Sequence, residues 1–409
     1  MFTLFVLLTG YAQASQCPTI PRRIIQCTTL GGSESIGLIL RGPVQASLGT
    51  KQFLLTWEHP ANMHDSIAST ARPRLRTWSR SPGSDWRELN PSLVLPRELL
   101  GLRAVVLGGA LYAVWGMDSL SNGERTRAIY AARLEPGGWA KPTAIFHGPY
   151  DRLLWDSPSV SDPVYLRSRV LLAGPMTGGK STARIVLLVG NKSGHWESQL
   201  IRPNGGVIYS SLSADSMRLA LTYIGAVSSG GRNRNSVSSV LSTDGGETWT
   251  TPTILRLGSP GTPTAYEVRS LNVLGRLHAV WFQESDGGTR WDLVHTRMMN
   301  TGDWAAANVV ATGTGATPTN LSVLPDGRSG AVLVFAALND GRYTPSFIEF
   351  DGHRWGTPLV LPLDGMITEA RVVTSDSTGF VVLAAVASGP LSQSVRSHLQ
   401  LVHVKSVPK

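Results

Sequence analysis

Cysteine and long apolar runs are scarce in this chain of 409 residues, and each shortage disfavours a class of protein. The two cysteines form no paired C-x-x-C motif, so a thiolate zinc site is disfavoured. After the first residues, no apolar stretch is long enough to span a membrane as a helix. A Walker loop and a G-x-S-x-G nucleophile elbow are also missing, which disfavours nucleotide hydrolysis and serine-esterase chemistry. We expect no cofactor and assign no metal ligand.

Charge is also sparse, and its basic part is almost entirely arginine. Charged residues make up 16% of the chain, which is too few for a solvated coil, and the formal net charge is +9. Only six of the 37 basic residues are lysines, and the other 31 are arginines. Arginine binds planar anions through two parallel hydrogen bonds, so carboxylate, sulfate or phosphate partners are expected. A composition bias with a solvated surface is the alternative. Without a basic run or an RNA-binding motif, nucleic acid is not expected.

The N-terminus predicts export. Residues 1–14 contain an apolar stretch that ends in Ala-Gln-Ala at residues 12–14, which favours a secretory signal cleaved at that point, although its usual basic start is missing. We expect residues 15–409 to form a single domain that is secreted or periplasmic. Cys17 and Cys27 lie near the mature N-terminus, and in an exported protein a disulfide between them is expected, with two free thiols as the alternative.

Six tryptophans recur at almost even intervals, each after a glycine-containing turn. The spacings are 53, 57, 53, 55 and 51 residues. A near-constant period of this length indicates that one supersecondary unit is repeated along the chain. We expect these tryptophans to fill space between neighbouring units, because a large buried ring contributes much packing energy, and ligand stacking is the alternative. The six are Trp86, Trp139, Trp196, Trp249, Trp304 and Trp355.

Four short strands make up each unit. In the second unit we expect them at residues 102–108, 111–117, 127–135 and 139–146. The second strand recurs seven times between residues 53 and 385, whereas the fourth recurs six times before the chain ends. The sequence therefore predicts an all-β fold, a seven-bladed β-propeller with four-stranded antiparallel blades. We expect a strand near residues 22–29 to complete the last blade, which would close the ring and remove an exposed edge.

One unit carries a sharper motif at residues 242–249, Ser-Thr-Asp-Gly-Gly-Glu-Thr-Trp. It resembles the Asp-box, S-x-D-x-G-x-T-W, of sialidases and other BNR-repeat propellers. Asp244 and Ser242 are expected to order the turn, Gly246 to permit unusual backbone dihedral angles, and Trp249 to anchor the turn to its blade. The resemblance implies that this turn is a folding device and lies on the face opposite an active site.

The resemblance also implies a mechanism that this sequence matches only in part. Sialidases use three arginines, a Tyr–Glu nucleophile pair and an Asp acid/base, and most have six blades, so a six-bladed propeller is the alternative fold. Residues 266–269, Tyr-Glu-Val-Arg, supply suitable side chains, but neighbouring residues of a strand point to opposite faces. The catalytic set is therefore not transferred. Seven-bladed BNR-type propellers include polysaccharide lyases, other glycan-active enzymes and noncatalytic proteins.

Basic residues recur in the loops expected around one mouth of the channel. These are the loops between the second and third strands and the loops that enter each unit. Converging cations would raise the local concentration of an anionic ligand, whereas turns with their own solvated ion pairs would contribute little. The arginines assigned to ligand binding are Arg125, Arg152, Arg269, Arg290, Arg342 and Arg371.

Four residues are candidates for catalysis: Glu267, Glu369, Tyr266 and His64. Each glutamate lies two residues before an arginine, so each pair shares one face of a strand and can line the channel. Such a pair would supply an anion clamp and a general base, or would only be a buried ion pair that holds the inner strands. His64 lies in the longest loop, where a histidine with a tyrosine suits proton abstraction beside a uronate. A metal site or an ordinary loop is the alternative there. His195, His278 and His295 are interpreted as structural.

Two functions therefore remain open. The first is an exported glycan-active protein, a sialidase-like glycosidase or a polysaccharide lyase, that binds or processes an acidic glycan at an arginine-rich mouth. The second is a noncatalytic propeller that serves as a protein- or glycan-binding scaffold in the cell envelope. The sequence leaves the ligand, the reaction class and the oligomeric state undecided.

Overall fold

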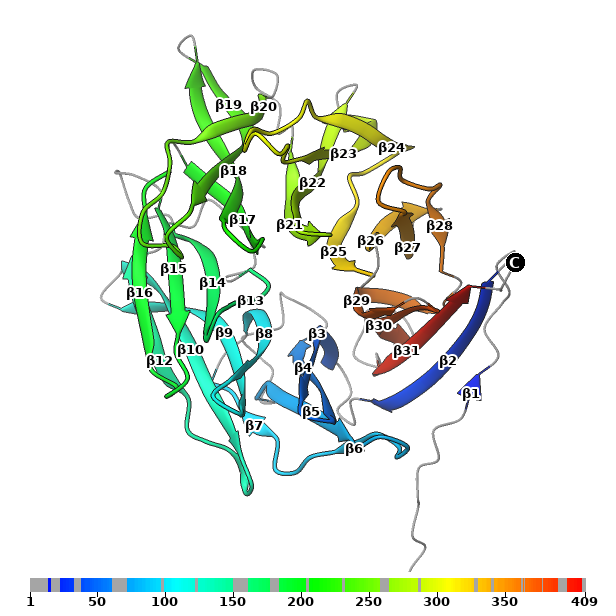
Figure 1. Ribbon diagram of the computed structural model, residues 1–409. Coiled ribbons are helices and arrows are strands. Elements are labelled where there is room, and N and C mark those ends of the chain that lie inside the picture. The colour runs from blue at the N-terminus through cyan, green and yellow to red at the C-terminus, as the bar shows by residue number, and fades with distance from the viewer. Residues whose placement is uncertain are drawn as a thin grey trace, which may run out of the picture.

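The computed structural model consists of β-strands joined by turns and loops, and the part of the chain that it describes contains no helix able to cross a membrane. Seven antiparallel sheets are arranged in a ring (Figure 1). The residues described are 14–15, 23–32, 38–60, 72–96, 99–121, 124–149, 161–176, 184–203, 206–229, 232–257, 265–285, 288–326, 330–339, 342–361, 363, 365–376, 378–388 and 396–406.

The first four blades follow one another along the chain. Blade 1 holds β3 (Leu38–Leu48), β4 (Lys51–Pro60), β5 (Arg74–Arg80) and β6 (Arg87–Glu88), with β7 (Leu93–Val94) also paired to β5. Blade 2 holds β8 (Leu100–Leu107), β9 (Ala110–Ser121), β10 (Glu124–Glu135) and β11 (Gly138–Trp139), with β12 (Thr143–Pro149) paired to β10. Blade 3 holds β13 (Val164–Leu166), β14 (Arg169–Met176), β15 (Arg184–Gly190) and β16 (Trp196–Ile201). Blade 4 holds β17 (Gly206–Ala214), β18 (Leu219–Ser229), β19 (Arg232–Ser242) and β20 (Thr253–Leu257).

The last three blades complete the ring. Blade 5 holds β21 (Tyr266–Val273), β22 (Arg276–Ser285), β23 (Arg290–Arg297) and β24 (Asn308–Thr314). Blade 6 holds β25 (Thr319–Pro325), β26 (Ala331–Asn339), β27 (Arg342–Phe350) and β28 (Leu359–Val360). Blade 7 holds β29 (Met366–Asp376), β30 (Gly379–Ser388), β31 (Arg396–Ser406) and, from the other end of the chain, β2 (Arg23–Gly32) and β1 (Ala14–Ser15). The seven-bladed prediction is confirmed and the six-bladed alternative is wrong.

The N-terminal strand closes the ring, as the sequence predicts. β2 pairs antiparallel with β31, with Ile25 opposite Val404 and Cys27 opposite Val402. The outer edge of blade 7 is thereby taken from the opposite end of the chain (Figure 1). Cys27 is buried and disulfide-bonded, and the other cysteine of the sequence, Cys17, lies outside the described residues.

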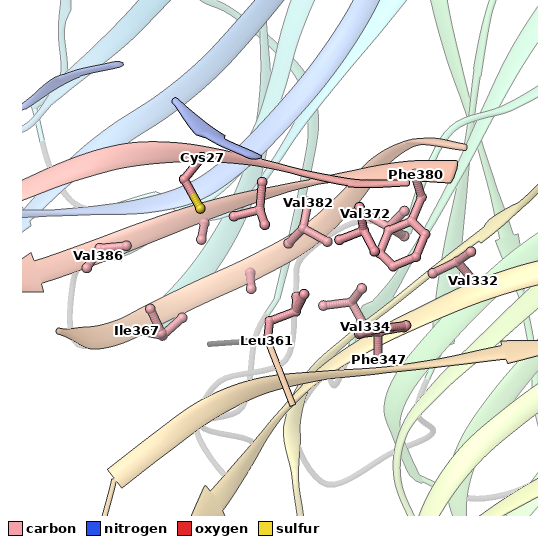
Figure 2. Packing of buried hydrophobic residues seen from close by; sticks show 14 residues of the cluster. Cys27, Val332, Val334, Phe347, Leu361, Ile367, Val372, Phe380, Val382 and Val386 are labelled. Carbon is pink, nitrogen blue, oxygen red and sulfur yellow. The ribbon is translucent and has the colours of Figure 1, made fainter. Parts of the chain in front are cut away.

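Apolar side chains fill the spaces between blades. Figure 2 shows the contact between blades 6 and 7, where Val334 and Phe347 face Val382 and Phe380. The rings of Phe347 and Phe380 have centroids 5.0 Å apart. Burying one such side chain contributes about 1.5–3 kcal/mol. Because every blade alternates inward-facing apolar residues along its strands, the ring is held by a series of such contacts rather than by one central core.

The repeated tryptophans pack between blades, each against the blade that precedes its own. Trp139 contacts the core of blade 1, Trp249 that of blade 3 and Trp355 that of blade 5. The fourth strand expected over residues 139–146 is divided, because β11 ends at Trp139 and β12 starts at Thr143, and the corresponding strands β20 and β28 start after Trp249 and Trp355. Proline, which has no N–H to donate, stands directly before the first residue of these two strands and of β12.

Two histidines are buried between blades 5 and 6. His278 Nδ1 and His295 Nε2 lie 2.8 Å apart and share a hydrogen bond, and the two rings are stacked. Phe350 and Trp355 of blade 6 cover the His295 ring. Both histidines are therefore part of the packing between blades, as expected from the sequence.

Candidate functional site in the central channel

Six of the inner strands break register near their first residues, at the face of the ring where each blade is entered from the previous one. In four of them a residue of the bulge takes a left-handed backbone conformation: Gly42, Gly101, Glu267 and Asn320. Glycine adopts this conformation without penalty, whereas for a glutamate it costs on the order of 1 kcal/mol. A bulge re-aims the side chains around it, so these positions set what faces the channel.

Three arginines from different blades share one carboxylate partner. Arg103 on β8, Arg269 on β21 and Arg371 on β29 all interact electrostatically with Asp162, the second residue before β13. Arg103 and Arg269 make the same backbone contact, because each donates from Nη1 to the carbonyl of the preceding residue, at 2.8 and 3.0 Å. With two glutamates described below, these residues form the central ionic cluster. Its members are Arg103, Asp162, Glu267, Arg269, Glu369 and Arg371.

One contact of the cluster spans the centre of the ring. Asp162 Oδ1 lies 2.9 Å from Arg103 Nε in the neighbouring blade and 3.7 Å from Arg371 Nη1. Arg371 belongs to blade 7, and blades 1 and 2 lie between it and the blade of Asp162. In Figure 1, β13 and β29 accordingly stand on opposite sides of the central space.

The charges of the cluster shift one another. Burial lowers the pKa of Arg103 to about 9, and the carboxylate of Asp162 opposes that shift. Burial disfavours the charged form of Asp162, but Arg103, Arg371 and Arg269 outweigh it and lower its pKa to about 2. Burial likewise disfavours the charge on Arg371, but Glu369 and Asp162 outweigh it and raise its pKa. Arg103, Asp162 and Arg371 are therefore charged at neutral pH.

Glu267 binds the next blade. Its two carboxylate oxygens accept hydrogen bonds from the backbone N–H groups of Asn320 and Leu321, at 2.8 and 2.6 Å, and Oε2 lies 3.7 Å from Arg269. These bonds hold the bulge of β25 against β21. Glu267 is thus placed as an anchor between blades as well as a member of the cluster.

Glu369 makes the corresponding connection where the ring closes. Its Oε2 accepts from the backbone N–H of Gly42 at 2.6 Å, and its Oε1 accepts from Arg371 Nε at 2.9 Å. Both oxygens are therefore engaged, as they are in Glu267. The alternative that the Glu-x-Arg pairs hold the inner strands describes this arrangement well.

Tyr266 does not join the cluster. Its hydroxyl donates to Glu284 Oε1 on β22 at 3.0 Å. Burial raises its pKa above the ordinary value, and the carboxylate of Glu284 raises it further. A phenol and a carboxylate thus form a separate pair at the same end of blade 5.

The other predicted ligand-binding arginines stand at the ends of strands. Arg290 is exposed at the start of β23, opposite Ser285, and the backbones of Arg125 and Arg342 occupy similar places early in β10 and β27. These strand ends lie on the same face as the starts of the inner strands. Arg152 and His64 lie outside the described residues.

The turn at residues 242–249 lies at the opposite face and is ordered by its own side chains. Ser242 Oγ donates to Asp244 Oδ1 and accepts from the Gly246 N–H. Asp244 accepts from the hydroxyl and N–H of Thr248, and these bonds lower its pKa. Trp249 Nε1 donates to the Gly246 carbonyl at 3.0 Å.

Sequence reasoning missed two members of the cluster, Arg103 and Asp162. Gly101 and Glu267 are both left-handed residues of a bulge, and each stands two residues before an arginine of the cluster, Arg103 or Arg269. The spacing is therefore the same, but the search for Glu-x-Arg pairs missed Arg103 because a glycine stands in place of the glutamate. Asp162 lies in a blade whose inner strand has three residues, so no strand pattern in the sequence marked its position.

No family model and no curated protein matches the chain. Among solved structures it is similar to the NanB sialidase from Streptococcus pneumoniae, at 13% identity over 93% of this chain and 70% of that one, with a TM-score of 0.46. It is also similar to the α-L-arabinanase from Penicillium chrysogenum, at 17% identity over 77% of this chain and 94% of that one, with a TM-score of 0.44. For the Trypanosoma rangeli sialidase the identity is 13%, over 91% and 56%, with a TM-score of 0.45. Likeness at this level carries no argument about function.

Proposed function

We propose that the protein binds an acidic saccharide at the channel end that holds the central ionic cluster. The observation that carries this proposal is the convergence of Arg103, Arg269 and Arg371, from blades 2, 5 and 7, on a single carboxylate. Guanidinium groups recognise planar anions by paired hydrogen bonds, and the ligand carboxylate of a uronate or sialoside is such an anion. The sialidase resemblance of residues 242–249 adds support for a glycan, since that family also uses three arginines.

Binding without cleavage fits the cluster best. Glycoside hydrolysis needs one carboxylic acid that donates a proton and one carboxylate that acts as base or nucleophile. Asp162, with its pKa lowered to about 2, stays ionised and cannot be the acid. The oxygens of Glu267 and Glu369 are engaged with backbone N–H groups and Arg371. We therefore assign these glutamates to positioning the arginines.

Hydrolysis is the second candidate, and the Tyr266–Glu284 hydrogen bond favours it. A tyrosine becomes a nucleophile when a neighbouring base takes its proton, and the sialidase resemblance implies such a pair. A fluorogenic sialoside tests this candidate directly. Turnover by the wild-type protein and its loss in Tyr266→Phe would support it, whereas equal rates in the two proteins would reject it.

The binding experiment uses a panel of sialosides, uronans and sulfated glycans with calorimetry. Arg371→Gln should weaken binding of the best ligand at least tenfold, because it removes a charge that faces the channel. Arg218→Gln is the matched control, since Arg218 also pairs with a carboxylate at 2.9 Å, that of Asp215, but at the opposite face. Melting curves of both variants report folding. A panel without any ligand, or equal affinity in Arg371→Gln and the wild type, would reject the proposal.

We also propose that the protein is exported, with cleavage after Ala14, and that it acts as a secreted or periplasmic protein. The apolar segment at residues 1–14 supports this. N-terminal sequencing of protein recovered from outside the cytoplasm should begin at Ser15. Recovery of the intact chain from the cytoplasm alone would reject export.

A further inference from the structure

Asp162 is the accessible member of the central ionic cluster. Its side chain is 48% exposed, whereas those of Arg103 and Arg371 are 2% and 17% exposed. Glu267 and Glu369 are also largely covered, because they bind the adjoining blades. The Asp162 carboxylate is therefore the charged group of the cluster that is most open to a ligand from solvent.

The cluster contains three guanidinium groups and three carboxylates, so its formal charge is balanced. Asp162 contributes the third negative charge and lies against two of the arginines. Without it, the same place would carry an excess positive charge in surroundings of low dielectric, where charges act strongly.

The two contacts of Asp162 differ in length. Asp162 Oδ1 forms the closer ion pair with Arg103 Nε, at 2.9 Å, and the longer one with Arg371 Nη1, at 3.7 Å. The Nε–H of Arg103 donates to the backbone carbonyl of Ser161 at 3.0 Å, which fixes Arg103 beside Asp162. A ligand anion can therefore displace Asp162 from Arg371 while the ion pair between Arg103 and Asp162 remains.

We propose that Asp162 is a specificity-determining residue that competes with ligand anions for Arg371. Resting on the proposed function, this inference narrows the ligand class. A simple anion gains little binding free energy, because it must replace the attraction between Asp162 and Arg371 and must also approach the negative charge of Asp162. A saccharide that carries both a carboxylate and hydroxyl groups gains more binding free energy. Its carboxylate takes the place of Asp162 at Arg371, and its hydroxyls donate hydrogen bonds to the Asp162 oxygens.

The test is the affinity of Asp162→Asn for two simple anions without hydroxyl groups, acetate and inorganic sulfate, measured by calorimetry. The asparagine keeps an oxygen that can accept from Arg103 but removes the competing charge. We expect Asp162→Asn to bind each probe at least tenfold more tightly than the wild-type protein does. Asp162→Glu, which restores the charge, should return the affinity toward the wild-type value. Asp162→Ser serves as a second neutral variant if the asparagine variant fails to fold.

Asp351→Asn is the matched control, because Asp351 also pairs with an arginine, is 57% exposed and lies at the opposite face. Its affinity for both probes should equal that of the wild type. Equal or weaker binding of the probes by Asp162→Asn, including binding by neither protein, would overturn the inference.

The two proposals fail separately. If the wild type binds an acidic glycan and Asp162→Asn gains no affinity for the probes, Asp162 is not a competitor but the binding function stands. If the wild type binds no glycan of the panel but Asp162→Asn binds acetate and sulfate more tightly than the wild type does, the competition is supported and the proposed function is rejected.

Discussion

Acid should destabilise this protein through the two histidines buried between blades 5 and 6. Burial is the main cause that lowers the pKa of His278 to about 4 and that of His295 to about 3, and nearby Arg297 lowers both further. In the unfolded chain each imidazole titrates near 6.5. Below that pH the unfolded chain binds protons that the folded protein does not bind. Stability is therefore full above about pH 6.5 and falls as the pH drops toward the folded-state values.

The magnitude follows from the width of that window. One group contributes about 1.4 kcal/mol per pH unit, so between pH 6.5 and about 4.5 each histidine lowers the free energy of unfolding by roughly 3 kcal/mol. Both together remove about 5 kcal/mol, which is a large part of the 5–15 kcal/mol that stabilises a typical domain.

Urea unfolding between pH 7.5 and 4.5 measures this loss. The double variant His278→Phe/His295→Phe should flatten the dependence, because two apolar rings replace both partners of the buried hydrogen bond and still pack on Phe350 and Trp355. A residual slope is expected from His398 and His403, whose pKa values are lowered by burial. His195→Phe, at an exposed turn, should keep the wild-type slope. An unchanged slope in the double variant would refute the reasoning.

Three further outcomes concern stability and are measured by urea unfolding. Gly108→Ala should destabilise the fold strongly, because the added Cβ would lie 1.9 Å from the Lys192 carbonyl oxygen. Gly109→Ala is the control, because its Cβ meets no atom and it should cost only about 1 kcal/mol for its left-handed backbone. Equal costs for the two variants would contradict the contact with Lys192. Glu267→Ala should cost about 2–4 kcal/mol, since two partly buried N–H groups of β25 lose their acceptor. A cost below that of Glu267→Gln would argue against the anchor. Phe347→Ala should cost about 3–5 kcal/mol through the cavity left between blades 6 and 7, and a loss under 1 kcal/mol would show that this contact is not a core.

The blades could be predicted because their determinants are local. A tryptophan after each glycine turn and the apolar second strands recur with the period of the fold, so Trp139 and Trp249 locate their blades without any knowledge of contacts. The fourth strand of blade 2 was expected over residues 139–146, but the long part of it, β12, starts at Thr143, directly after Pro142. The tryptophan marks the turn correctly, whereas the start of the paired segment depends on where the proline leaves the partner strand without a donor.

Only part of the candidate site could be predicted from the sequence. Arg269 and Arg371 were identified because both follow a glutamate at the same spacing. Their common partner, Asp162, is remote in sequence from both. Asp162 reaches Arg371 only because seven blades close into a ring, and the sequence of a single repeat does not predict this closure. The bonds from Glu267 to β25 were likewise unpredictable, because they depend on a bulge in the following blade.

The pairing of β2 with β31 imposes an order on synthesis. Residues 23–32 are synthesised before blades 1 to 6, whereas their partners, residues 396–406, are synthesised after them. Until residues 396–406 emerge from the ribosome, the edge of β2 that pairs with β31 is unsatisfied and blade 7 is incomplete, although blades 1 to 6 have already been made. Because Arg371 also belongs to this last blade, the ionic cluster is completed only after the other six blades, and a product truncated before residue 366 would lack it however well those blades had formed.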